Sequence, residues 1–106
     1  MSRPRADLDV FHAIADPTRR AILDRLRAGP AAVNAVASEF TLSRPAVSKH
    51  LRTLRQARLV REERLGRKRL YYLRPEALQP VAGWIEGYRS FWQVSLTKLK
   101  RYLEES

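Results

Sequence analysis

Hydrophobic positions between residues 42 and 59 recur with the spacing of a single helix face. This segment reads LSRPAVSKHLRTLRQARL, and its apolar residues fall at i, i+4 and i+7, which predicts an amphipathic helix over residues 43–57. The residues that form the apolar stripe are Val47, Leu51 and Leu54. The stripe is narrow, so most of the helix surface is left for polar side chains.

The first turn and the polar side of this helix are consistent with that assignment. Ser43 can cap the helix with its hydroxyl, and Pro45 is tolerated in the first turn because no backbone donor is needed there. The side opposite the apolar stripe carries Arg44, Ser48, Lys49, Arg52 and Arg55. Such a surface fits a DNA major groove, although an ordinary solvated helix would show the same pattern.

The chain before this segment predicts two helices that meet at a short corner. Leu8, Phe11 and Ile14 give helical spacing to residues 6–15. Asp16 then offers a capping carboxylate and Pro17 a favourable first helical residue, so we expect a second helix to begin there. Its apolar side continues until Gly29-Pro30 ends the pattern.

A third, short helix is predicted over residues 32–40, directly before the helix at residues 43–57. Ala37 is small enough to allow the tight crossing of two helices that a short turn joins. The turn itself is Thr41-Leu42, with threonine where such turns often have glycine. Two short helices joined in this way form a helix-turn-helix unit.

The hydrophobic period changes after Ala57 and predicts a β-hairpin. Residues 59–65 and 69–73 have the composition of strands, and Gly66 begins the turn between them. The predicted tip carries three consecutive cations, Arg67, Lys68 and Arg69. A helix-turn-helix followed by a basic hairpin is a winged helix. The hairpin can also serve only as a lid on the core, but three adjacent cations repel one another unless phosphates are near.

The C-terminal segment predicts a long helix from about residue 76, which Pro80 kinks or restarts. Its apolar stripe consists of Val81, Trp84, Ile85, Tyr88, Phe91, Trp92, Leu96, Leu99 and Leu103. A small domain has little room to bury this stripe, so we expect a homodimer interface. The interface residues predicted here are Leu8, Phe11, Trp84, Tyr88, Phe91, Trp92, Leu96 and Leu99. Packing within one chain and a cofactor pocket are the alternatives.

Gly83 and Gly87 flank this stripe four residues apart. Glycine destabilises a helix, so their presence suggests that a second helix approaches closely at this point.

Positive charge is concentrated in one third of the chain. The 106 residues carry a formal net charge of +10, and the segment 44–74 holds eleven Lys and Arg residues against Glu62 and Glu63. Nine of the ten net charges therefore lie in the predicted helix and hairpin, as expected of a protein that binds a polyanion. If the charge served only solubility, it would not need to be concentrated in one segment.

Composition also narrows the class of protein. The chain has no cysteine, no apolar run long enough to span a membrane and no signal-peptide pattern at its start. We therefore expect one cytoplasmic domain over residues 1–106, without disulfides or thiolate metal sites. No glycine-rich phosphate loop is present, and Glu62 and Glu63 would point to opposite faces of a strand. We expect neither an enzyme nor a cofactor.

Several segments, in order, resemble one known family. DPTRRAILDRL (16–26), LSRPAVSKHLRTLRQARLV (42–60), GRKRLYYL (66–73) and a W…YRSFW…L…LKRYLEE tail are similar to ArsR-type winged helix-turn-helix repressors. The resemblance covers about residues 8–105. It implies a mainly helical winged fold with a small β-hairpin, and dimerisation helices near residues 6–15 and 76–104.

The resemblance further implies a dimeric bacterial transcription regulator that represses from an inverted-repeat operator. Some members sense metals through a cysteine-rich box or through His and acidic ligands on the terminal helices. The cysteine box is absent here, and no histidine follows His50. No pattern identifies a small-molecule effector. Two alternatives stay open: a metal-responsive repressor that uses His12, Asp9, Glu104 and Glu105, and a winged-helix module that binds RNA or a protein.

If the helix at residues 43–57 enters a major groove, its outward N-terminal half reads the bases. Arg44 can donate two hydrogen bonds to a guanine edge, and Pro45 can contact a thymine methyl. His50, beside the apolar stripe, suits packing or a phosphate contact. The DNA-binding residues predicted in full are Ser43, Arg44, Pro45, Ser48, Lys49, His50, Arg52, Arg67, Lys68 and Arg69.

Overall fold

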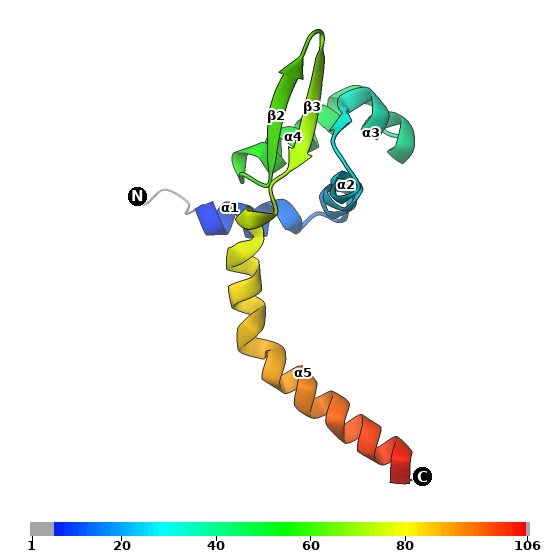
Figure 1. Ribbon diagram of the computed structural model, residues 1–106, viewed down its shortest axis with the longest axis vertical. Helices are drawn as coiled ribbons and strands as arrows, with labels where there is room; N and C mark the ends of the chain where they lie inside the picture. The colour runs from blue at the N-terminus through cyan, green and yellow to red at the C-terminus, as the bar shows by residue number, and fades with distance from the viewer. Residues whose placement is uncertain (1–5, 106) are drawn as a thin grey trace.

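The computed structural model describes residues 6–105, with side chains from residue 9 onward. In chain order the elements are α1 (Ala6–Ile14), α2 (Pro17–Arg27), β1 (Ala31–Ala32), α3 (Val33–Phe40), α4 (Arg44–Gln56), β2 (Val60–Leu65), β3 (Lys68–Leu73), the 3₁₀ helix η1 (Pro75–Leu78) and α5 (Gln79–Glu105). The predicted mainly helical winged helix-turn-helix fold is confirmed. Figure 1 shows that the β2–β3 hairpin and the end of α5 lie at opposite ends of the molecule.

The corner between α1 and α2 is held by the DPTRR segment. The Asp16 carboxylate accepts a hydrogen bond from the backbone N–H of Arg19 at 2.9 Å, as predicted for a helix cap. The Arg19 side chain donates to the carbonyl of Ala13 at 2.7 Å, and Arg20 donates to that of Ile14 at 2.8 Å. The two arginines therefore satisfy carbonyls that the end of α1 leaves without helical partners.

The helix-turn-helix unit consists of α3 and α4. Thr41 ends α3 with a left-handed backbone, at φ 53°. The next N–H, of Leu42, donates to the carbonyl of Ala37 at 3.0 Å, which completes a Schellman cap. The Ser43 hydroxyl then accepts from the N–H of Ala46 at 3.2 Å, so the predicted cap of α4 is confirmed.

The same cap joins α4 to the wing. Arg58 has a left-handed backbone at φ 62°. Its N–H donates to the Arg55 carbonyl at 2.9 Å, and the N–H of Leu59 donates to the Leu54 carbonyl at 3.0 Å. Leu54 and Leu59 are both fully buried, so an apolar contact accompanies the hydrogen bonds. The wing therefore begins at a fixed angle to α4.

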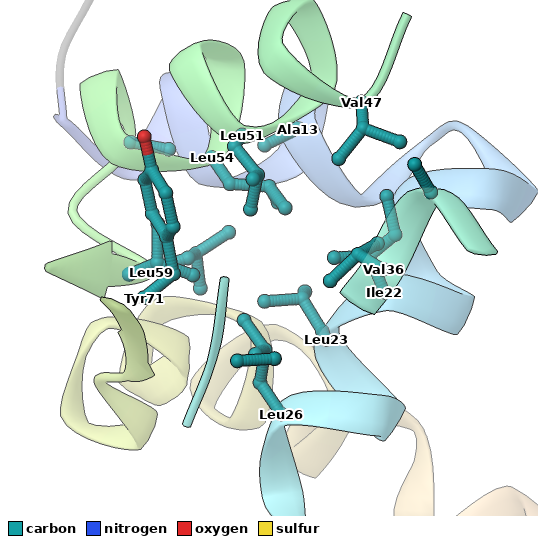
Figure 2. Close-up of a cluster of buried hydrophobic side chains, with 14 of the residues drawn as sticks. Ala13, Ile22, Leu23, Leu26, Val36, Val47, Leu51, Leu54, Leu59 and Tyr71 are labelled. Carbon is teal, nitrogen blue, oxygen red and sulfur yellow. The ribbon is translucent and has the colours of Figure 1, made fainter. Parts of the chain in front are cut away.

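One hydrophobic core connects the four N-terminal helices with the base of the sheet. The predicted stripe of Val47, Leu51 and Leu54 is completely buried. Figure 2 shows these side chains of α4 facing Ile22 and Val36. Because its apolar side is fixed in this way, α4 presents its polar side to solvent in a single orientation.

The sheet has three antiparallel strands in the order β1-β3-β2. The short strand β1 was not predicted, because two alanines after a glycine and a proline have no strand signal of their own. Ala31 and Ala32 pair with Tyr71 and Leu70 of β3. Nothing but the tertiary contact with β3 makes this segment extended.

The wing tip is tighter than the sequence predicted. Leu65 pairs with Lys68, so the turn consists of Gly66 and Arg67 alone. Gly66 has φ +63°, which suits glycine at the first position of a two-residue hairpin turn. Lys68 and Arg69 belong to β3 and lie on opposite faces of the hairpin, rather than together at its tip.

The C-terminal segment is a 3₁₀ turn followed by a long helix. η1 ends at Leu78, and α5 starts at Gln79 with Pro80 in its first turn, so the predicted restart is confirmed. The chain has a radius of gyration of 18.0 Å, whereas a compact chain of this length has about 13 Å. The difference arises because α5 projects from the rest of the molecule (Figure 1). Within residues 6–105, no helix combines the length and apolar character needed to cross a bilayer.

Candidate nucleic-acid interface

The polar side of α4, strand β3 and the hairpin turn line a groove of about 670 Å³. Arg44 and Ser48 line it from α4, while Arg67, Lys68 and Arg69 line it from the wing. Five of the ten predicted DNA-binding residues are therefore gathered around one open groove. Three more, Pro45, Lys49 and Arg52, are exposed on α4.

The first turn of α3 completes the groove, and this contribution of α3 was not predicted. Ala32, Val33, Asn34 and Ala35 line it. These small and neutral residues carry no sequence signal for a binding surface. Their contribution depends on the packing of α3 against α4, in which Ala37 is buried.

Ser43 and His50, the other two predicted DNA-binding residues, do not line the groove. The Ser43 oxygen already accepts a hydrogen bond as the cap of α4. His50 is half-buried and does not line the groove. It interacts with Asp16: the backbone N–H of Arg19 lowers the pKa of that carboxyl, burial opposes this, and the charge of Arg19 and the interaction with His50 lower the pKa further.

Two arginines face each other across the wing. Arg64 and Arg69 are direct cross-strand partners, and they share the face of the hairpin that carries Val60 and Tyr71. Like charges directly opposite each other destabilise a sheet. Glu62 lies on the same face and pairs with Arg69, which offsets part of this repulsion.

Glu62 is the acidic residue within this basic face. Its Oε2 atom lies 2.6 Å from Nη1 of Arg55 on α4, and its Oε1 atom lies 3.4 Å from Nε of Arg69 on β3. The Tyr71 hydroxyl donates to Oε2 at 3.3 Å. Burial, and then the Glu62 carboxylate, raise the pKa of Tyr71, so its hydroxyl keeps the proton that it donates.

The outer face of the wing has separate ion pairs. Arg61 contacts Glu63 at 2.9 Å, and its guanidinium lies 4.1 Å from the centre of the Tyr72 ring. Glu62 and Glu63 therefore have different partners on different faces, as strand geometry requires.

A second surface runs along α5. The rings of Phe11 and Trp84 make an edge contact at 6.0 Å, and Trp84 lies 5.3 Å from Tyr88, which lies 6.5 Å from Phe91. These contacts connect α1 with α5 and leave most of the stripe uncovered. The predicted interface residues on α5 that are exposed are Trp84, Tyr88, Phe91, Trp92, Leu96 and Leu99. Leu8 lies outside the residues whose side chains are described.

The two glycines of α5 border open space. A Cβ atom built on Gly83 or Gly87 has no neighbour within 4 Å. Among the described residues, no atom of another element is in contact distance of these positions, so the close approach suggested by the sequence would have to involve another molecule.

The residues named for a metal-responsive alternative are dispersed. Asp9 and His12 are on α1, whereas Glu104 and Glu105 are at the far end of α5. Among the described residues, no three His, Cys, Asp or Glu side chains cluster closely enough to hold a metal ion. A site of this composition would need ligands from a second chain.

Comparison with known proteins gives consistent results. Residues 14–63 match the family model described as a helix-turn-helix domain. The HTH-type transcriptional regulator Rv2034 of Mycobacterium tuberculosis is 42% identical over 97 residues, covering 92% of this chain and 88% of the relative. The transcriptional repressor SdpR of Bacillus subtilis is 40% identical over 80 residues, covering 76% and 89% respectively.

Solved structures have the same fold. The ArsR family transcriptional regulator RHA00566 superposes with a TM-score of 0.73 at 34% identity, covering 87% of this chain and 95% of that one. The homodimeric winged helix-turn-helix DNA-binding domain Mb0332 of Mycobacterium bovis superposes with a TM-score of 0.64 at 27% identity, covering 77% and 76%.

Proposed function

Because this chain belongs to the ArsR-type family of winged helix-turn-helix transcriptional regulators, we propose that it is a homodimeric cytoplasmic repressor that binds an inverted-repeat DNA operator. Each protomer places α4 in a major groove and its wing on the adjacent backbone or minor groove. No metal ion or other cofactor takes part in DNA binding.

The groove between α4 and the wing is the observation that carries this proposal. It gathers one base-reading candidate, Arg44, with the cations Arg67 and Lys68 that suit phosphates. Since α4 is fixed by a fully buried apolar stripe, the backbone positions that carry these side chains have a constant geometry relative to one another. Constant geometry is what distinguishes sequence reading from diffuse attraction to a polyanion.

The proposed dimer rests on the uncovered stripe of α5. Phe91 and Leu96 are 68% and 65% exposed in the single chain, and a contiguous apolar surface of this kind indicates a protein interface. A symmetric pair would present two copies of α4, which matches an inverted repeat with half-sites one or two helical turns apart. The homodimeric structural neighbour supports this arrangement.

The proposed direction of regulation rests on a relative. SdpR, with 40% identity over most of both chains, is named a transcriptional repressor. A dimer that covers a promoter sequence would exclude the polymerase from it.

Selection of bound fragments from genomic DNA tests the proposal. We expect one enriched motif with twofold symmetry, bound by two protomers in sedimentation analysis, and less transcription in vitro from a promoter that contains it. A monomer without preference for any duplex would overturn the proposal. Competition by RNA as effective as by the operator, or an affinity that changes on addition of Zn²⁺, would favour one of the two alternatives instead.

A further inference from the structure

Glu62 is placed between the two parts of the proposed DNA-binding surface. Its side chain is only 17% exposed, although it belongs to the most basic segment of the chain. The carboxylate contacts Arg55 of α4 at 2.6 Å and Arg69 of β3 at 3.4 Å. From its place on β2, Glu62 therefore contacts α4 with one carboxylate oxygen and β3 with the other.

The contacts of Glu62 are set by the register of the hairpin. Tyr71 is its direct cross-strand partner and donates to the same oxygen as Arg55. Since Tyr71 belongs to the buried core, the carboxylate has a fixed support on one side. Its two arginine partners keep about half of their side-chain surface, 54% for Arg55 and 61% for Arg69, open to solvent.

We propose that Glu62 determines the specificity of DNA binding by withholding Arg55 from phosphates and restraining Arg69 against the wing. This inference rests on the proposed function. An arginine that is free to move along the surface binds the backbone of any duplex, because a phosphate contact carries no sequence information. Each additional contact of this type raises affinity about fivefold at physiological salt and steepens the salt dependence by about 0.9.

Glu63 provides the matched control. It is the neighbouring residue, carries the same charge and is 45% exposed, but within residues 6–105 its ion pair is with Arg61 alone, on the outer face of the wing. The substitutions Glu62→Gln and Glu63→Gln thus change the net charge equally. A general effect of charge predicts the same result for both variants, whereas the proposal predicts different results.

The experiment measures affinity for the selected operator and for a random duplex of equal length, as a function of salt. Relative to Glu63→Gln, we expect Glu62→Gln to bind the random duplex about five- to twentyfold more tightly, with a salt slope steeper by about one to two. Affinity for the operator should rise less, so the ratio of operator affinity to random-duplex affinity should fall. Equal behaviour of the two variants would overturn the proposal.

Arg55 allows a second test that does not require a folded Glu62 variant. In the wild-type background, Arg55→Gln should reduce affinity for the random duplex clearly less than Arg52→Gln does, because Glu62 already holds Arg55. Arg52→Gln, one turn away on the exposed side, should reduce that affinity about fivefold. Loss of the same size in both variants would contradict the role of Glu62. Wild-type protein without operator preference would overturn the proposed function as well.

Discussion

Two residues with left-handed backbone end the helices of the helix-turn-helix unit. Thr41 follows α3 and Arg58 follows α4, at φ 53° and 62°. Glycine adopts this conformation without strain, whereas a β-branched residue does so at a cost. Thr41 stands where other turns of this type often have glycine, so the fold retains local strain at its central turn.

Replacing Thr41 by glycine should stabilise the protein. Relief of left-handed strain, roughly 1–2 kcal/mol, exceeds the greater entropy of glycine in the unfolded chain, roughly 0.5–1 kcal/mol. We expect a net increase of about 0.5–1 kcal/mol in the free energy of unfolding, measured by chemical denaturation. The control is Thr53→Gly inside α4, which should lose about 0.3–0.5 kcal/mol from helix propensity. A loss of stability in both variants would show that relief of strain at Thr41 does not outweigh the entropic cost of glycine.

Asp16 makes stability depend on pH. Its pKa lies below the ordinary value of 3.8, first because the Arg19 N–H binds the ionised form. The stabilisation is therefore complete above pH 3.8 and is lost as the pH falls through the lowered pKa. Asp16→Asn should be less stable than wild type at neutral pH and should approach it in acid. Thermal unfolding at several pH values measures this, with Asp24→Asn as control. A constant difference at all pH values would contradict it.

At the scale of elements, α4 and the wing have different roles in the proposed DNA complex. Arg44 lies in the groove near the start of α4, while Arg67 is in the hairpin turn. The first is suited to a base edge and the second to the backbone or an adjacent minor groove.

Alanine substitution should separate these two roles. Arg44→Ala should lose about 1–3 kcal/mol for the operator and relax the preference at one base pair. Arg67→Ala should weaken all duplexes alike and reduce the salt slope by about one. Competition titrations with operator and random DNA distinguish the variants. Equal losses of Arg44→Ala on both duplexes would reject its assignment as a base reader.

Local signals explain why the helices were predictable. Asp16 and Pro17 start α2, and Ser43 and Pro45 start α4, so both helices begin where the sequence indicates. The hairpin was also predicted, but its register was not. Pairing of Leu65 with Lys68 depends on the closing of a two-residue turn, which moves Lys68 from the predicted turn into a strand.

The candidate site was predictable as a set of residue types, but not as an arrangement. Helical spacing separates the buried stripe from the polar side of α4. Spacing alone does not show that Arg44 and Ser48 face the wing. Nor does it show that Glu62 reaches Arg55, because that contact joins two elements through the sheet register. Such contacts follow from tertiary packing, which a single sequence does not contain.

At the scale of the whole molecule, α5 is long relative to the body that it leaves. The chain measures 62 × 40 × 21 Å along its principal axes, and its apolar stripe continues beyond the contact with α1. A projecting helix with this surface gains stability chiefly from a partner. The proposed dimer would turn an elongated protomer into a compact pair.

Substitution of Gly87 tests how closely the second helix approaches. Gly87→Leu places a side chain in space that is open in the single chain and raises helix propensity by about 1 kcal/mol. We expect α5 to remain helical while the dimer dissociates at a higher protein concentration, measured by light scattering. Gln93→Leu, on the polar side of α5, should leave the association unchanged. An unaltered oligomeric state in Gly87→Leu would refute close contact at this position.

The cap at Arg58 has a consequence for control of the protein by any signal. Two backbone hydrogen bonds, together with the buried Leu54 and Leu59, fix the end of α4 to the start of β2. A signal that acts on one protomer therefore cannot change the angle between α4 and the wing without unwinding the last turn of α4. For the proposed dimer, we expect release from DNA to come from a change in the distance between its two copies of α4. That distance would be set at the proposed interface on α5.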